Sequence, residues 1–175
     1  MEDERLHYIA ITGIIIKDRK FLITKRSPKE KAFPGLWTVP GGRIRKSDYA
    51  TFPKDTADHW YNVLEKALER ETKEEVGLKI KNIRYLLSLS YIRSDGIPTI
   101  IMSFYCDYAG GKVRLSGELV EYAWVTGDEL SKYKFVPGLR EEIELVNKIL
   151  KGAKHDIWKG KYDSSSDKSL RDGES

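Results

Sequence analysis

A cluster of three glutamates offers the clearest chemistry in the sequence. Glu71, Glu74 and Glu75 belong to a segment from about Trp60 to Leu78 that follows helical periodicity. One side of this helix is apolar and contains Trp60, Val63, Leu64, Ala67 and Leu68. The glutamates continue that side by one more turn, where desolvation and mutual repulsion disfavour charged carboxylates. A hard divalent cation, which takes oxygen ligands and bridges to phosphates, would compensate them.

The alternative for these glutamates is a solvated helix surface. Arg70 and Lys73 are close enough along the helix to form ion pairs with them, as on many exposed helices. In that case the apolar side simply ends where the helix leaves the core. The helix alone does not decide between the two interpretations.

Size and composition predict a single domain without a membrane span. The chain has 175 residues, 40% of them hydrophobic, which is enough for one sizeable core. There is no apolar run of about 18 residues, and the acidic N-terminus lacks the layout of a signal peptide. We therefore expect a cytoplasmic protein. The single cysteine, Cys106, excludes an internal disulfide and a zinc site built from several cysteines.

Basic residues are concentrated upstream of the glutamates. Seven of them lie between Lys25 and Lys46, with Glu30 as the single acid. A positive field beside a carboxylate cluster suits a small polyanionic ligand. A polymeric nucleic acid is not expected as a partner, because no DNA- or RNA-binding motif accompanies the basic residues.

The predicted elements indicate an α/β (α+β) fold with a mixed sheet. β-rich runs cover residues 7–16, 20–25, 36–39, 79–93, 98–108 and 121–125. Helical spacing covers the glutamate helix, with Thr56 or Asp58 as N-cap and Gly77 at its end, and residues 139–150. Because strands and helices do not alternate regularly, antiparallel hairpins with helices on the sheet faces are favoured.

Turns and polar stretches mark the domain limits. Residues 17–19 and 94–96 predict hairpin turns, and Pro40-Gly41-Gly42 and Gly110-Gly111 predict further turns. Residues 45–58 are polar and aperiodic, which is typical of an inserted loop. We expect one domain over residues 1–150 and a polar, partly disordered tail over residues 151–175.

Three motifs resemble the Nudix hydrolase family. Residues 70–78, RETKEEVGL, resemble the second half of the Nudix box, R-E-U-x-E-E-x-G-U, in which U is aliphatic; all five fixed residues agree and Thr72 departs at the first U. Residues 37–42, WTVPGG, resemble the strand and double glycine that open the box. Glu118, six residues before Trp124, resembles the family's late glutamate. The resemblance covers about residues 7–150.

One part of the box departs from the family pattern. The box normally has five residues between its glycine and a glutamate, and seven more before the arginine. With seven residues between it and Arg70, the glutamate position falls on Asn62, and the glycine position is displaced to Gly42 by about fourteen inserted residues. The missing glutamate is usually structural, so we expect metal binding to survive and the insertion to affect the substrate.

The resemblance implies a Nudix-like α/β/α sandwich and a magnesium- or manganese-dependent hydrolase. Its metal ligands would be the Gly41 carbonyl and the carboxylates of Glu71, Glu74, Glu75 and Glu118. Arg70 would orient the carboxylates, and either Glu71 or Glu118 would activate water. Arg26 resembles the family's phosphate-contacting arginine.

The substrate implied by the resemblance is a nucleoside diphosphate linked to a further group. By elimination among subfamily motifs, we favour a nucleoside triphosphate, canonical or oxidised, cleaved to monophosphate and pyrophosphate. Coenzyme A, a nucleotide-sugar, or binding without turnover are the alternatives. Trp37 and Phe135 are candidates for contacting the base, although aromatic residues are more often part of a core. Many relatives are dimers, so a homodimer is a further expectation.

Overall fold

The computed structural model describes residues 4–155. The predicted C-terminal tail therefore lies outside the described residues from position 156 onward. Among residues 4–155, no helix is long and apolar enough to cross a membrane. The cytoplasmic location and the homodimer stay predictions.

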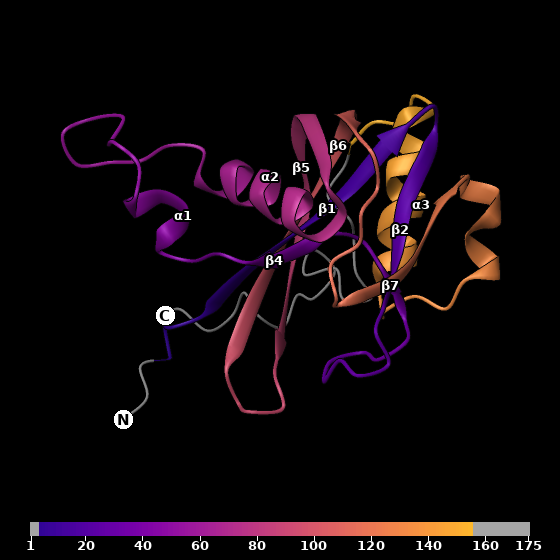
Figure 1. Cartoon of the computed structure of the whole chain (residues 1–175), viewed down its shortest axis with the longest axis horizontal. Coiled ribbons are helices and arrows are strands. Elements are labelled where there is room, and N and C mark those ends of the chain that lie inside the picture. The colour runs from indigo at the N-terminus through magenta and orange to yellow at the C-terminus, as the bar shows by residue number, and fades with distance from the viewer. Residues whose placement is uncertain (1–3, 156–175) are drawn as a thin grey trace, which may run out of the picture.

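Seven strands form one mixed sheet (Figure 1). They are β1 (Tyr8–Lys17), β2 (Lys20–Arg26), β3 (Trp37–Thr38), β4 (Gly41–Arg43), β5 (Leu78–Ile92), β6 (Pro98–Gly111) and β7 (Leu119–Val125). The main order is β3-β2-β1-β6-β5, while β4 pairs with β1 and β7 pairs with β2. Only the pairing of β1 with β6 is parallel among the described strands.

Two of the predicted turns are confirmed and two are wrong. Asp18 and Arg19 have positive φ angles of 50° and 60° between paired Lys17 and Lys20, as a two-residue hairpin requires. The β5–β6 hairpin turns at residues 94–96, with Ile92 opposite Pro98. By contrast, Gly41 and Gly42 belong to β4, and Gly110 and Gly111 continue β6, because each finds a backbone partner in a neighbouring strand.

The isoleucines of β1 divide the interior into two cores. Ile11 and Ile15 pack with the helix α2 (Val63–Val76), whereas Ile14 and Ile16 pack with the helix α3 (Leu139–Leu150). Successive side chains of a strand point to opposite faces, so the two helices cover opposite sides of the sheet. The predicted α/β/α arrangement is confirmed, and α3 has the predicted bounds.

The region before α2 differs from its prediction. The helix begins at Val63, not near Trp60, and its N-cap is Asn62 with a left-handed φ of 55°, so neither Thr56 nor Asp58 caps it. The predicted aperiodic loop contains a one-turn helix, α1 (Ser47–Ala50). A 3-10 helix, η1 (Gly127–Lys132), was also not predicted; it begins with a capping box between Thr126 and Glu129.

Candidate active site

Two of the three predicted glutamates lie on the sheet-facing side of α2. Glu71 follows Ala67 and Leu68 on the buried face and is only 5% exposed. Glu75 is one turn further and half-buried, whereas Glu74 is exposed. Gly77 ends the helix with φ 70°, and its N–H donates to the Lys73 carbonyl at 3.1 Å. The helix therefore presents Glu71 and Glu75 to β4 and leaves Glu74 at the rim.

The double glycine of β4 provides the space for Glu71. A Cβ atom on Gly42 would collide with the carboxylate of Glu71, so no larger residue fits opposite this glutamate. A Cβ atom on Gly41 would overlap the Ile11 carbonyl oxygen of β1. Both glycines are thus required by close packing. For Gly41 this reason differs from the predicted one, which was access of a metal to its carbonyl.

Glu75 is held by the backbone of the same strand. The Gly41 N–H donates to Glu75 Oε2 at 3.0 Å. Burial raises the pKa of Glu75 to about 7, the Gly41 N–H opposes that rise, and the negative charges of Glu71 and Glu118 add to it. Two carboxylates beside each other thus share a site in which negative charge is costly.

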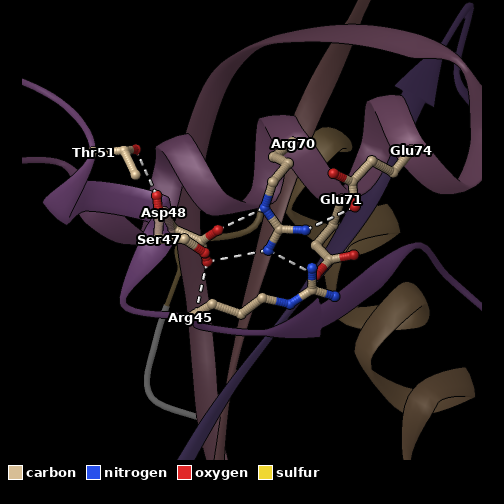
Figure 2. A network of polar contacts seen from close by, with 7 residues as sticks. All are labelled: Arg45, Ser47, Asp48, Thr51, Arg70, Glu71 and Glu74. Carbon is tan, nitrogen blue, oxygen red and sulfur yellow. Dashed lines mark hydrogen bonds and ion pairs between the residues drawn. The ribbon is translucent and has the colours of Figure 1, made fainter.

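Arg70 ties the carboxylates to the preceding loop (Figure 2). Its guanidinium contacts Glu71 Oε1 at 2.9 Å and Glu74 Oε2 at 2.9 Å. The same group forms two bonds to Asp48, from Nε at 2.7 Å and from Nη2 at 3.1 Å. Burial lowers the pKa of Arg70, but the bonds to Asp48 and Glu71 outweigh it and the pKa is raised overall. The predicted orienting role fits this geometry.

Asp48 is a site residue that the sequence prediction missed. Its side chain is buried, and although burial raises its pKa, the bonds from the Arg70 side chain and the Arg45 N–H lower the pKa overall. Asp48 has five residues between itself and Gly42, which is the box spacing for the missing glutamate. Counting forward from Gly42, and allowing aspartate in place of glutamate, would have found it.

The insertion therefore lies between Asp48 and Arg70, not upstream of the acid. Its own contacts hold it together: the rings of Tyr49 and Trp60 pack at 5.5 Å, and the Trp60 indole donates to the Phe52 carbonyl at 2.9 Å. Figure 1 shows this segment extending away from the sheet beyond α1. The predicted insert at residues 45–58 is thus shifted towards α2, because Asp48 must stay with Arg70.

Glu118 approaches from the loop before β7. The Ser116 N–H donates to the Glu75 carbonyl at 2.8 Å, and the Ser27 N–H donates to the Glu118 carbonyl at 2.8 Å. The loop is thereby fixed both to the end of α2 and to the end of β2. Glu118 itself is exposed, and its charge acts on Glu75. The sequence prediction thus named three carboxylates that the fold brings together: Glu71, Glu75 and Glu118.

Arg26 lies at the end of β2 on the Glu75 side. Its Nε donates to the Ala32 carbonyl at 2.8 Å, and its Nη2 contacts Glu30 Oε2 at 3.2 Å. Its charge also lowers the pKa of Glu75. The guanidinium therefore stands beside the carboxylates, partly engaged by its own loop.

Trp37 and Phe135 pair with each other, but they lie on the α3 side of the sheet and not on the α2 side, where the glutamates are. They form an isolated parallel bridge, with the Val136 N–H donating to the Trp37 carbonyl at 2.9 Å. Both pack against the core that contains α3, and the Trp37 ring meets Tyr133 edge-on at 4.9 Å. The structure brings this pair together without placing it among the glutamates.

The donor set fits a hard divalent cation. The charges of Glu71 and Glu118 act on Glu75 where burial makes negative charge costly, which is the environment that Mg²⁺ or Mn²⁺ relieves. Within the described part of the chain, no three His, Cys, Asp or Glu side chains already stand at metal-binding spacing. Arg70 draws Glu74 outward and the Gly41 N–H engages Glu75, so binding a cation requires these two side chains to turn.

Comparison with known proteins gives one consistent result. Residues 7–146 match the NUDIX domain family model. The chain is 31% identical over 126 residues to an 8-oxo-dGTP diphosphatase of Buchnera aphidicola subsp. Schizaphis graminum, covering 71% of this chain and 82% of the relative. It is 28% identical over 141 residues to the NAD-capped RNA hydrolase NudC of Chromobacterium violaceum, covering 80% of this chain but only 44% of that relative.

A solved structure shows the same fold. The MutT protein of Methanosarcina mazei Go1 has a TM-score of 0.62 and 21% sequence identity, covering 87% of this chain and all of that chain. This likeness supports the fold. The family model covers all five elements that contribute to the site, namely β2, β4, α1, α2 and the loop before β7. The chain belongs to the Nudix family and is a pyrophosphohydrolase of that family.

Proposed function

We propose that this protein hydrolyses a nucleoside triphosphate, canonical or oxidised, to the monophosphate and pyrophosphate with Mg²⁺ or Mn²⁺. The observation that carries the proposal is the convergence of Glu71, Glu75 and Glu118 beside the backbone of Gly41. A 31% identical relative bears the name 8-oxo-dGTP diphosphatase, which supports a triphosphate substrate.

The cation would be held by Glu71, Glu75 and Glu118, with Glu74 and the Gly41 carbonyl as further oxygen donors. When bound, it supplies charge neutralisation at the phosphates and a water of lowered pKa. Arg70 and Asp48 keep Glu71 in place, since the Arg70 guanidinium bonds to both. Glu71 or Glu118 accepts the proton of the attacking water, and Arg26 supports a phosphate oxygen by charge.

The domain proposed to carry this function spans residues 1–150; the elements from β1 to α3 lie within these bounds. Trp37 and Phe135 are proposed to contact the base only at the far end of the substrate, because they lie on the α3 side of the sheet. Either residue replaced by alanine should raise KM for a triphosphate without lowering kcat.

The test is a substrate panel with purified protein. Canonical and oxidised nucleoside triphosphates, a nucleotide-sugar and coenzyme A are incubated with Mg²⁺, with Mn²⁺ and with a chelator. Released pyrophosphate is measured, and the nucleotide products of every substrate are separated by anion-exchange chromatography, because a nucleotide-sugar and coenzyme A release no pyrophosphate. We expect pyrophosphate from a triphosphate, dependence on the cation, and loss of turnover in Glu75→Gln.

Two outcomes would contradict the proposal. Faster cleavage of coenzyme A or a nucleotide-sugar than of any triphosphate would refute the substrate. Thermal stabilisation by a nucleotide with no turnover on any substrate would favour a binding module instead. A Glu75→Gln variant with full activity would refute the site assignment while leaving the family unchanged.

A further inference from the structure

Arg45 is a basic residue at the rim of the site that no sequence motif selects. It follows β4, and its backbone N–H donates to Asp48 Oδ2 at 2.8 Å. Asp48 is in turn bonded to Arg70, which holds Glu71. The Cα position of Arg45 is therefore fixed by the same network that fixes the glutamates. In Figure 2 its side chain runs along this network and ends beside Glu71.

The guanidinium of Arg45 has no partner of its own among residues 4–155. Arg70 makes the direct contacts to Asp48, Glu71 and Glu74, at 2.7–3.1 Å. Arg45 is exposed, and both of its hydrogen bonds are made by its backbone: its N–H donates to Asp48 Oδ2 and its carbonyl accepts from the Asp48 N–H. Its positive charge acts on both Asp48 and Glu71 without a direct contact. The N–H donors of its guanidinium are therefore available to an incoming anion.

A second arginine acts on the neighbouring glutamate. Arg26 acts on Glu75, whereas Arg45 acts on Glu71, and these two glutamates are one helical turn apart. Arg26 comes from the end of β2 and Arg45 from the chain after β4. Each of the two glutamates therefore has its own arginine, and an anionic chain lying along the pair would meet both.

We propose that Arg45 binds the terminal phosphate of the leaving group and thereby selects substrates that carry a third phosphate. Such substrates are nucleoside triphosphates, whose leaving group is pyrophosphate. A nucleotide-sugar also has a phosphate on each side of its scissile bond, but it carries a neutral sugar where a triphosphate carries its terminal phosphate, so it gains nothing from Arg45. This inference rests on the proposed function, and guanidinium bidentate to phosphate is the contact expected.

The experiment compares Arg45→Gln, Arg45→Lys and Arg43→Gln with the natural protein. Arg43 is the matched control, because it lies two residues earlier and its guanidinium stacks on the Tyr8 ring at 5.4 Å. Two readouts are taken: kcat/KM for dGTP and for UDP-glucose, and the affinity for inorganic pyrophosphate with Mg²⁺ by calorimetry. The second readout does not depend on turnover.

We expect Arg45→Gln to weaken pyrophosphate binding and kcat/KM for dGTP by about 10- to 100-fold, the loss of one charged hydrogen-bonding group. For Arg45→Lys, both values should lie between those of Arg45→Gln and those of the natural protein. Arg43→Gln should match the natural protein in both. For UDP-glucose, Arg45→Gln should change little. Urea unfolding of each variant checks that the fold is retained.

The failure of this inference differs from failure of the proposed function. Equal losses on dGTP and UDP-glucose would show that Arg45 acts through Glu71, and unchanged pyrophosphate affinity would also overturn the inference. If the natural protein cleaves no nucleoside triphosphate of the substrate panel, the proposed function fails, and the pyrophosphate affinities alone still decide whether Arg45 binds phosphate.

Discussion

Among residues 4–155, one glutamate is buried on each side of the sheet, and the groups that surround the two side chains differ. Glu71 on α2 is 5% exposed and Glu142 on α3 is 6% exposed. Glu71 is paired with Arg70 at 2.9 Å and lies beside Glu75. Glu142 has a hydrogen bond from the Ser103 hydroxyl, and its Oε2 has no hydrogen-bond partner among residues 4–155.

The difference between these surroundings distinguishes a buried glutamate of the site from a buried glutamate of the core. On the α2 side a guanidinium, a second acid and two close glycines surround the carboxylate. Burial raises the pKa of Glu71, but the hydrogen bond and the positive charge of Arg70 oppose that rise. On the α3 side burial raises the pKa of Glu142, the Ser103 hydroxyl opposes that rise, and no cation compensates the charge. Burial on the α3 side therefore shifts Glu142 towards its neutral form.

The largest expected effect is on catalysis in Glu71→Gln. Removing this carboxylate takes away a cation ligand and a candidate base, so kcat should fall by about 100- to 10,000-fold. The matched control is Glu142→Gln, an equally buried glutamate on the other face, which should keep its activity. Steady-state kinetics with Mg²⁺ measure both variants. An equal fall in kcat for the two variants would show that activity depends on any buried glutamate and not on the position of Glu71 on α2.

Asp48→Asn should give the next largest effect, because it breaks one end of the Arg70 network. We expect a fall of about tenfold in kcat with little change in KM, and a loss of about 1–3 kcal/mol in unfolding free energy, since Arg70 loses a charged partner. Asp48→Glu should keep the activity of the natural protein, because glutamate is the residue that the Nudix box usually has at this spacing.

The control for that variant is Asp58→Asn, an aspartate of the same insertion whose side chain is 80% exposed. It should change neither kcat nor stability. A KM effect as large as the kcat effect in Asp48→Asn would mean that Asp48 shapes the substrate pocket instead of holding Glu71. These measurements separate positioning from binding.

The sequence predicted local elements well and tertiary pairings less well. The hairpin at residues 17–19, the helix at residues 139–150 and the carboxylate group were all readable from periodicity and turn chemistry. Asp48 was missed because its partner Arg70 is 22 positions away, and an ion pair across an insertion leaves no periodic signal. Gly41 and Gly42 were assigned to a turn because glycine alone does not reveal a neighbouring strand.

Glu142→Gln should change stability in a pH-dependent way. The pKa of Glu142 is raised above 4.5 in the folded state, so its contribution is fully favourable below about pH 4.5 and is lost as pH rises through the folded pKa. The variant should therefore be more stable than the natural protein by about 1 kcal/mol at pH 8 and equal to it near pH 4.5. Urea unfolding at both pH values checks this, and a difference that is the same at both would contradict the neutral-acid interpretation.

The smallest expected effect comes from Thr72, where the box usually has an aliphatic residue. Its side chain is completely buried on α2, and its Oγ1 has no hydrogen-bond partner. Thr72→Val keeps the shape and removes the buried hydroxyl, so unfolding free energy should rise by about 1 kcal/mol while activity stays the same. Thr99→Val is the control, because Thr99 is also buried with an unpartnered hydroxyl but lies on β6. If both variants gain stability, the gain belongs to hydroxyl burial in general. If Thr72→Val loses activity and Thr99→Val does not, the Thr72 hydroxyl helps to position the neighbouring Glu71. The buried face of α2 then needs this polar group for activity.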